Sequence, residues 1–320
     1  MSPGYDEPND MTHASLNSDY SKLDHVEKKA IEGDVQYQLI LANAYYDGIG
    51  IERDYRRAFR WYLRAAKSNN AQGLYMTARC YDLGHGVKIN NGKAFKLFLQ
   101  SANLGYAPAQ YTVGVTISKR KDNKDTDYLN WLSLAAEQGY VEAQYDLACA
   151  MDQRNGDTQD YKKAFRLYKF AAEQDHYNAV SCLASCYKCG RGTNVNYREA
   201  LRLYLVCYAQ EGIDHFRKID IMLNIASIYE IDGDSNANLK RALHWYRLAA
   251  NKGSDKAKYH IGCFHEHGWV VKKDIPEALK WYYEAALHMN ADAYNRYNTL
   301  NPSGVMELVA DMKRHGVHFR

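Results

Sequence analysis

The segment Asp54–Ala66, DYRRAFRWYLRAA, is the part of the chain from which the fold is most directly predicted. Its middle residue, Ala58, is followed three and four residues later by a Trp-Tyr pair, and seven and eight residues later by an Ala-Ala pair. These offsets place the five side chains on one stripe of a helix with about 3.6 residues per turn. The segment is therefore predicted to be an amphipathic helix, with both members of the Trp-Tyr pair in the interior.

The same pattern returns six more times at a spacing near 36 residues. The residue in the middle of each copy is small, except for one tyrosine: Ala58, Ala94, Tyr128, Ala164, Ala200, Ala242 and Ala278. The copies divide the chain into units at residues 35–70, 71–106, 107–140, 141–176, 177–212, 213–254 and 255–290. Because a fixed period of this length is typical of stacked helical hairpins, the chain is predicted to be all-α and to need no division into separate domains.

Each unit also contains a first helix, a turn and a start signal for the second helix. The first helix is predicted from a large residue beside a small one, as in Leu41-Ala42 and Ile261-Gly262, where the small residue lets the second helix approach closely. Glycines follow it and are expected to close its last turn: Gly48, Gly84, Gly156, Gly190, Gly233 and Gly268. Asx residues four before the middle alanine are expected to cap the second helix: Asp54, Asn90, Asp160, Asn196, Asn238 and Asp274. Glu199 and Glu277 are expected to complete capping boxes.

The ends and the irregular stretches are interpreted separately. Residues 1–20 are polar and are predicted to be a disordered tail. Residues 21–34 are predicted to be a degenerate half repeat that caps the array. Residues 291–320 are expected to contain a second capping helix. The charged run at 119–125 is interpreted as a solvated loop, and the six extra residues around 213–218 as a local lengthening of a helix or loop.

Composition and charge exclude several classes of protein. The 41 basic and 38 acidic residues give a formal net charge of +3, which leaves no electrostatic signature of nucleic-acid binding. No apolar run approaches the roughly 18 residues that a membrane-spanning helix requires. The seven cysteines are odd in number, the start of the chain does not resemble a signal peptide, and no proline-free Asn-x-Ser/Thr acceptor is present. These features favour a cytoplasmic protein, although secretion as an effector by another route stays open.

The combination of Gly-x-Gly turn, Asx cap, alanine, Trp-Tyr pair and alanine doublet resembles the Sel-one-like repeat (SLR) family, a relative of the tetratricopeptide repeat. The resemblance covers residues 35–290. It implies a right-handed α-solenoid, an α/α superhelix of about seven helix-turn-helix repeats. It also implies a non-enzymatic adaptor or scaffold for protein partners, without a cofactor. The sequence indicates neither the identity of the partner nor the oligomeric state.

Candidate partner-binding residues follow from the first helices. If Ala143, Leu147 and Ala148 face the core, Tyr145 faces away from it, and the repeat period carries this position to the other units. The predicted wall consists of Asn43, Tyr46, Tyr75, Arg79, Asp82, Tyr111, Tyr145, Ser185, Lys188, Asn224, Tyr259 and His260. Tyrosine and arginine suit the capture of an extended peptide or a helix, because they bury a large area with little loss of conformational entropy.

Two alternatives stay open from the sequence alone. The first is a regulatory or secreted effector protein that acts through the same groove. The second is a metal- or ligand-binding helical enzyme, because side chains at i, i+3 and i+7 on one helix face could bind zinc: Cys182, Ser185 and Cys189, matched by His260, Cys263 and His267. Free cysteines of this kind are far commoner than metal ligands, so the sequence favours no metal.

Overall fold

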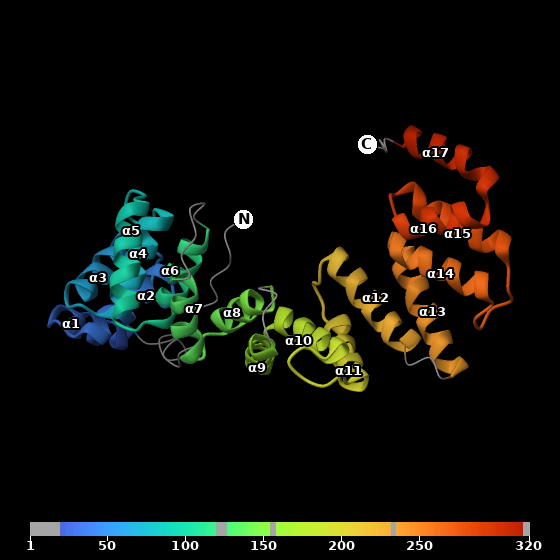
Figure 1. Ribbon diagram of the computed structural model, residues 1–320. Helices are drawn as coiled ribbons and strands as arrows, with labels where there is room; N and C mark the ends of the chain where they lie inside the picture. The colour runs from blue at the N-terminus through green and yellow to red at the C-terminus, as the bar shows by residue number, and fades with distance from the viewer. Residues whose placement is uncertain (1–19, 120–126, 154–157, 232–234, 316–320) are drawn as a thin grey trace. The chain divides into compact units, whose positions relative to one another are not determined.

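The structure, a computed structural model, describes residues 20–119, 127–153, 158–231 and 235–315 (Figure 1). Every helix or strand assigned within these ranges is a helix, in agreement with the predicted all-α class. Contacts within the chain group it into two compact units, residues 1–150 and 151–320. The boundary falls inside one helix, and each unit is described by itself below.

The first unit is built from helices that pack in the order of the chain, each against the next from α1 to α7. Their bounds are α1 (Tyr20–Ile31), α2 (Val35–Asp47), α3 (Tyr55–Lys67), α4 (Ala71–Leu83), α5 (Asn91–Asn103), α6 (Ala107–Ser118) and α7 (Asp127–Glu137). Helix α8 (Val141–Gln153) contains the boundary between the units. Ala30 in α1 is fully buried, so α1 lies against the first hairpin in the place expected for a half repeat.

The second unit continues the same hairpins. Its elements are α9 (Thr158–Glu173), α10 (Tyr177–Cys189), α11 (Tyr197–Ala209), α12 (His215–Ile231), α13 (Asn236–Asn251), α14 (Asp255–His267), α15 (Ile275–Leu287), α16 (Ala291–Leu300), the 3₁₀ turn η2 (Pro302–Gly304) and α17 (Val305–Arg314). The extra residues of the sixth repeat extend α12 to 17 residues. Helix α17 packs on α15 and buries Leu308 and Met312. The full set of predicted domain boundaries stays a prediction, because residues 1–19 and 316–320 lie outside the described part.

The core follows the predicted stripe, with one correction. The middle alanines of α3, α5, α9, α11, α13 and α15 are at most 1% exposed. Of the two large residues that follow the middle alanine at offsets three and four, however, only the second is fully buried, at 2% exposure or less: Tyr62, Tyr168, Tyr204, Tyr246 and Tyr282. The tryptophans are half-buried, so the prediction that both members are interior is wrong. The offset of three places the indole at the edge of the stripe, where the Trp281 Nε1 donates to Glu277 3.1 Å away.

The small residues of the first helices allow the predicted close approach. A Cβ added at Gly262 would lie 2.5 Å from the ring of Tyr282, which packs directly over the glycine. At Gly114 an added Cβ would lie 3.2 Å from a side-chain carbon of Leu132. In these two hairpins a bulky side chain of the second helix is therefore seated on a small residue of the first.

The turns agree with prediction where the structure describes them. Gly48, Gly84, Gly190 and Gly268 end their helices in the left-handed conformation, with φ of +71 to +76°. Four of the predicted caps are confirmed, because the side chains of Asp54, Asn90, Asn196 and Asp274 accept amide hydrogens of the second helix. Gly156, Gly233 and most of the charged run at 119–125 lie outside the described residues.

The other two predicted caps are wrong, because their helices begin earlier than the sequence suggests. Asp160 lies in the first turn of α9, which starts at Thr158. Asn238 lies inside α13, whose cap is Ser235. Both helices are 16 residues long, three more than most of the second helices.

The predicted capping boxes also do not form. The Glu199 carboxylate pairs with Arg202, and the Glu277 carboxylate pairs with Lys280. The reason is that the cap amide is already used: the Asn196 N–H donates to the carbonyl of Tyr187 at 2.8 Å. The same bond from cap amide to preceding helix recurs in the first, second and seventh repeats. It joins the two helices of these four hairpins and leaves no donor for the glutamates of the fifth and seventh.

The second glycine of the Gly-x-Gly turn brings neighbouring repeats together, and this generates a prediction. Gly86 has φ +73°, and a Cβ there would overlap the carbonyl oxygen of Tyr55 in the preceding hairpin. Gly105 has φ +86° but nothing within 4 Å of an added Cβ. Gly105→Ala is expected to cost about 1–2 kcal/mol from backbone strain alone. Gly86→Ala is expected to cost at least about 3 kcal/mol, because the two hairpins must also separate.

Urea unfolding followed by circular dichroism measures both losses, with Gly105→Ala as the matched control. Equal losses for the two variants would show that the approach of the turn to Tyr55 is not a constraint on the fold.

Candidate functional site

The predicted wall lies on the first helices of the hairpins, and we call its twelve residues the first-helix face. The structure places them at different depths. Tyr46 and Tyr75 are buried, and Asp82 is exposed. The other nine are half-buried: Asn43, Arg79, Tyr111, Tyr145, Ser185, Lys188, Asn224, Tyr259 and His260. The face is therefore a mixture of core side chains and accessible ones, and its role in binding stays a prediction.

Some members of the face are hydrogen-bond partners of the buried tyrosines. The Tyr62 hydroxyl donates to Asn43 Oδ1 at 2.6 Å. Burial raises the pKa of Tyr204, and a hydrogen bond from the Ser185 hydroxyl counteracts part of that rise. A buried phenol without a partner would cost free energy, so the fold itself requires a polar side chain at this position. Asn43 and Ser185 consequently have a structural role whether or not a partner binds.

In the second unit two glutamates take over this task, and the sequence reading did not identify them. The Tyr246 hydroxyl donates to Glu230 at 2.5 Å, and the Tyr282 hydroxyl donates to Glu266 at 2.7 Å. Burial, together with the neighbouring carboxylates, raises the pKa of both tyrosines. Glu230 and Glu266 occupy the same position in successive first helices, a recurrence 36 residues apart that was visible in the sequence.

The same glutamates connect one repeat to the next. His260 Nδ1 lies 3.4 Å from Glu230, and the ring of His260 stacks on Tyr246 with centroids 4.4 Å apart. Arg296 forms an ion pair with Glu266 through two of its nitrogens. The bond to Arg296 lowers the pKa of Glu266, which keeps this carboxyl ionised although it is only 6% exposed.

Lys188 makes the corresponding contact between the fifth and sixth repeats. Its Nζ donates to Asn224 Oδ1 at 3.0 Å and to Ser227 Oγ at 2.6 Å. Burial lowers the pKa of Lys188. One turn away, Arg191 binds Asp152 at 2.9 Å and Ser185 Oγ at 3.1 Å. Polar contacts between successive first helices therefore run along the second unit, and they fix side chains that the sequence assigned to partner binding.

The first unit has fewer of these contacts and more aromatic ones. The Tyr111 hydroxyl donates to Asp146 Oδ2 at 2.9 Å, and Tyr46 Oη lies 2.8 Å from His85 Nδ1. Burial raises the pKa of Tyr46 to about 12. Tyr75 packs edge-on against Tyr106, with ring centroids 5.2 Å apart. Tyr46 and Tyr75 thus belong to the interior, whereas Arg79 and Asp82 reach solvent beside them.

A second feature that the sequence reading missed is a glutamine at the fourth position of three first helices. The Nε2 groups of Gln38, Gln110 and Gln144 donate to the carbonyl oxygens of Ala30, Ala102 and Ala136 at 3.2–3.3 Å. Each of these alanines is the penultimate residue of the helix that precedes the glutamine's helix. The glutamines are 4–6% exposed, and they give each carbonyl a second donor beside the backbone N–H of Gly33, Gly105 or Gly139. The signal was their spacing of 72 and 34 residues, which matches the unit lengths.

The cysteine and histidine faces do not gather into a metal centre in the described part of the chain, where no three His, Cys, Asp or Glu side chains converge. Cys263 lies 3.4 Å from the Tyr282 hydroxyl, and His267 Nδ1 contacts the carbonyl of Cys263. Cys189 is exposed and Cys186 is buried. Among the described helices, none is both long and apolar enough to cross a bilayer.

The Glu266 contacts predict a dependence of stability on pH. The pKa of Glu266 is below its ordinary value of 4.5 in the folded chain, so the ionised carboxylate favours folding at neutral pH. That contribution is lost as the pH falls from 4.5 through the lower folded pKa. Glu266→Gln is expected to reduce the free energy of unfolding by about 1–3 kcal/mol at pH 7, and by progressively less below pH 4.5.

Urea unfolding at a series of pH values measures this difference, and Arg296→Gln serves as the matched variant on the other side of the pair. A Glu266→Gln loss that stayed constant down to pH 3, well below the ordinary carboxyl pKa of 4.5, would contradict the assignment.

The chain is similar in sequence to known regulators, among them two from yeasts. The chain is 28% identical over 246 residues to chitin synthase regulatory factor 3 of Schizosaccharomyces pombe, covering 74% of this chain and 26% of that protein. It is 26% identical over 285 residues to the chitin synthase regulator SKT5 of Saccharomyces cerevisiae, covering 85% and 40%. The chain thus spans less than half the length of these relatives.

A solved structure shows the same fold. It is c5321, a protective antigen of uropathogenic Escherichia coli that displays an SLR fold, with a TM-score of 0.63 and 24% identity over 92% of this chain and 64% of that one. The Sel1 repeat model matches residues 35–70, 71–106, 129–140, 141–176, 183–205, 222–254 and 255–288, close to the units read from the sequence. The chain belongs to the Sel1 repeat family, and its fold is that family's α-solenoid.

Proposed function

We propose that this chain is a non-enzymatic scaffold that binds an extended peptide or a helix of a partner protein along the first-helix face. The observation that carries the proposal is the set of accessible side chains next to a rigid core. In the first unit Arg79 and Tyr145 are half-buried and Asp82 is exposed, while Tyr75 and Ala148 beneath them are buried. Such anchored side chains bind with little loss of entropy.

The depth of each residue decides which part of the face a partner would contact. Arg79, Asp82, Tyr145 and Tyr259 are the members best suited to contact a partner, because their side chains are not wholly inside the core. Tyr46 and Tyr75 would support these residues from below.

The relatives favour a regulatory role for such a scaffold. Both yeast proteins are named as regulators of chitin synthase, and the matches to them cover 74% and 85% of this chain, most of which is the repeat array. We therefore propose that this chain regulates a partner enzyme by binding it, with a chitin synthase as one candidate. An effector that acts on a signalling protein through the same face is the alternative, and the identity of the captured partner distinguishes the two.

The state of the cysteines supports a reducing compartment for this function, as in the cytoplasm. All seven cysteines lie in the described residues and all are free thiols. Burial raises the pKa of both Cys80 and Cys186 to about 12, so these two thiols stay protonated and unreactive.

The proposal predicts the result of a partner capture. Arg79→Ala/Asp82→Ala/Tyr145→Ala removes three accessible side chains of the face in the first unit and leaves the buried tyrosines in place. Recovery of the native partner by affinity purification is expected to fall by at least about tenfold, since anchor residues contribute more than about 1 kcal/mol each.

The matched control removes the same kinds of side chain from the second helices: Arg247→Ala/Glu284→Ala/Phe170→Ala, all exposed. It is expected to retain the partner. Equal recovery with both triple variants, at unchanged helicity, would mean that the first-helix face is not the binding surface.

A further inference from the structure

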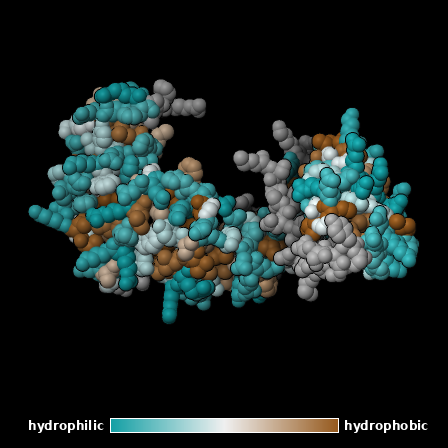
Figure 2. All heavy atoms as spheres, turned by 180° about the vertical axis from the view of Figure 1, so that it is seen from behind, coloured by the Kyte–Doolittle hydropathy of each residue, from teal (hydrophilic) through white to brown (hydrophobic). Residues whose placement is uncertain are grey.

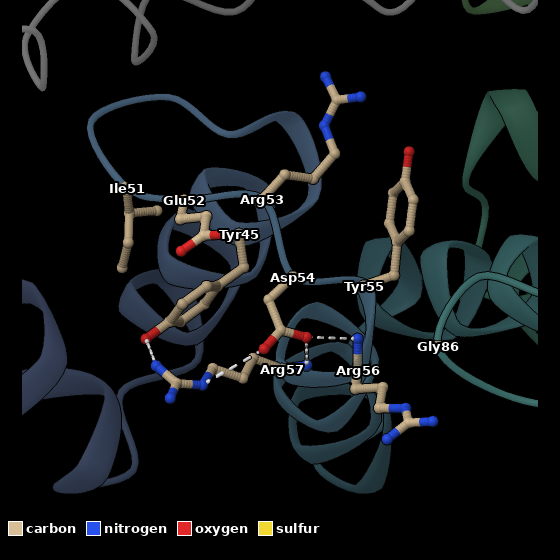
Figure 3. A pocket seen from close by; sticks show the side chains of 9 residues that line it. All are labelled: Tyr45, Ile51, Glu52, Arg53, Asp54, Tyr55, Arg56, Arg57 and Gly86. Carbon is tan, nitrogen blue, oxygen red and sulfur yellow. Dashed lines mark hydrogen bonds and ion pairs between the residues drawn. The ribbon is translucent and has the colours of Figure 1, made fainter.

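A pocket of about 650 Å³ opens at the start of α3 (Figure 3). Its lining consists of Tyr45, Ile51, Glu52, Arg53, Asp54, Tyr55, Arg56, Arg57 and Gly86. Three arginines against two acidic residues give the lining an excess of positive charge. None of these residues belongs to the predicted wall.

Two of the arginines are held in place by tyrosines of the same hairpin. Arg57 donates to the Tyr45 hydroxyl at 3.2 Å, and its guanidinium lies 5.4 Å from the centre of that ring. Arg53 donates to the carbonyl of Asp47 at 3.1 Å and lies 6.0 Å from the ring of Tyr55. Figure 3 shows Arg53 and Tyr55 projecting from the same side of the chain.

The tyrosine rings are themselves fixed. Tyr55 stacks on His85 with ring centroids 4.3 Å apart, and Gly86 next to it allows the following turn to close on the backbone of Tyr55. Because the ring of Tyr55 is held in place, Arg53 beside it loses less conformational freedom when it binds an anion. Arg57 already forms an ion pair with Asp54 at 3.4 Å, so Arg53 is the member of this pair that is left to bind a ligand.

The third arginine is available to a ligand. Arg56 is exposed, and its guanidinium has no hydrogen-bond or ion-pair partner among the described residues. In Figure 3 it points away from Asp54. The helix amides are not available, because Asp54 Oδ1 accepts from the backbone N–H groups of Arg56 and Arg57 at 2.9 and 3.0 Å. An anion would thus be bound by guanidinium groups.

The positive charge continues along α3. Beyond Arg56 lie three more exposed basic residues, spaced by four, four and three residues from one to the next: Arg60, Arg64 and Lys67. This spacing keeps them on one face of the helix. Helix α3 contains no acidic residue to compensate them.

This arrangement is specific to the first repeat. Arg53, Arg56 and Arg57 lie five, two and one residues before Ala58, and no other repeat has basic residues at all three of these offsets. In the seventh repeat the corresponding residues are Lys273, Pro276 and Glu277. Six other copies form the hairpin without this triplet, so the fold does not require it. Exposed arginines also contribute little to stability.

We propose that this pocket and the basic face of α3 bind an acidic peptide segment of a partner protein. Carboxylate or phosphate groups of the peptide would pair with Arg53 and Arg56, and the chain would continue along Arg60 and Arg64. The site shares no residue with the first-helix face but adjoins it, since Tyr46 of that face packs edge-on against Tyr55 with ring centroids 5.2 Å apart. A peptide is favoured over an anionic membrane because α3 exposes no large apolar side chain that could enter a bilayer.

The test uses the full chain and fluorescein-labelled peptides in anisotropy titrations at low salt. The probes are an alternating glutamate-glycine peptide, the same peptide with phosphoserine in place of glutamate, and a neutral glutamine-glycine peptide. Arg53→Glu/Arg56→Glu is expected to weaken binding of the acidic probes by at least about tenfold, since it reverses two charges at the site. Arg57 is kept because it supports the pocket.

The matched control is Lys240→Glu/Lys273→Glu, which reverses two exposed charges at the corresponding offsets in the sixth and seventh repeats. It should bind the probes as the unmodified chain does, and the preferred acidic probe identifies carboxylate or phosphate as the natural group. Equal affinity of the Arg53→Glu/Arg56→Glu variant, or equal binding of the neutral peptide, would overturn the proposal. So would cosedimentation with phosphatidylserine vesicles in the absence of any binding to the acidic peptides.

Discussion

The structure depends on a bulky side chain that is buried in each hairpin by its second helix, a tyrosine in five of these helices and Phe98 or Leu132 in the other two. Tyr282 over Gly262 shows the constraint most clearly, since an added Cβ would lie 2.5 Å from the ring. The ring is buried apolar surface, but its hydroxyl enters the core as well and must find a partner there. One side chain therefore fixes both the spacing of the helices and the chemistry of the facing position.

The need to pair the tyrosine hydroxyls explains why some polar side chains of the first helices are structural and others are accessible to a partner. Asn43 and Glu266 satisfy tyrosine hydroxyls, and Glu266 also pairs with Arg296 of the next hairpin. The residues free for recognition are those between these contacts, such as Asp82. The fold does not require the basic residues at the start of α3. The first repeat alone carries Arg53, Arg56 and Arg57 at these offsets, and the other hairpins form without them. Figure 2 shows that hydrophilic side chains cover much of the visible surface, with hydrophobic patches between them.

The repeat period was sufficient to predict the class of the fold, the hairpins and four of the helix caps, because small and large residues at fixed offsets leave one way to pack. It could not separate Tyr46, which is buried, from Asp82, which is exposed, although both occupy the same repeat position. Which member of a repeated position turns inward depends on its size and on its neighbours in the next hairpin. Local sequence also could not predict that α13 begins before Asn238. Nor could it predict that the backbone N–H of a capping residue, such as Asn196, would already be bonded to the preceding helix.

The central claim is that first helices present the binding surface while second helices hold the tyrosines that support it. Hydrogen–deuterium exchange of the full chain, with and without its captured partner, tests this most directly. The account predicts slower exchange on binding in the first helices α4 and α8, with a separate protected segment at α3 if the partner carries an acidic stretch. Protection confined to second helices such as α11, α13 and α15, with none in α4 or α8, would contradict it.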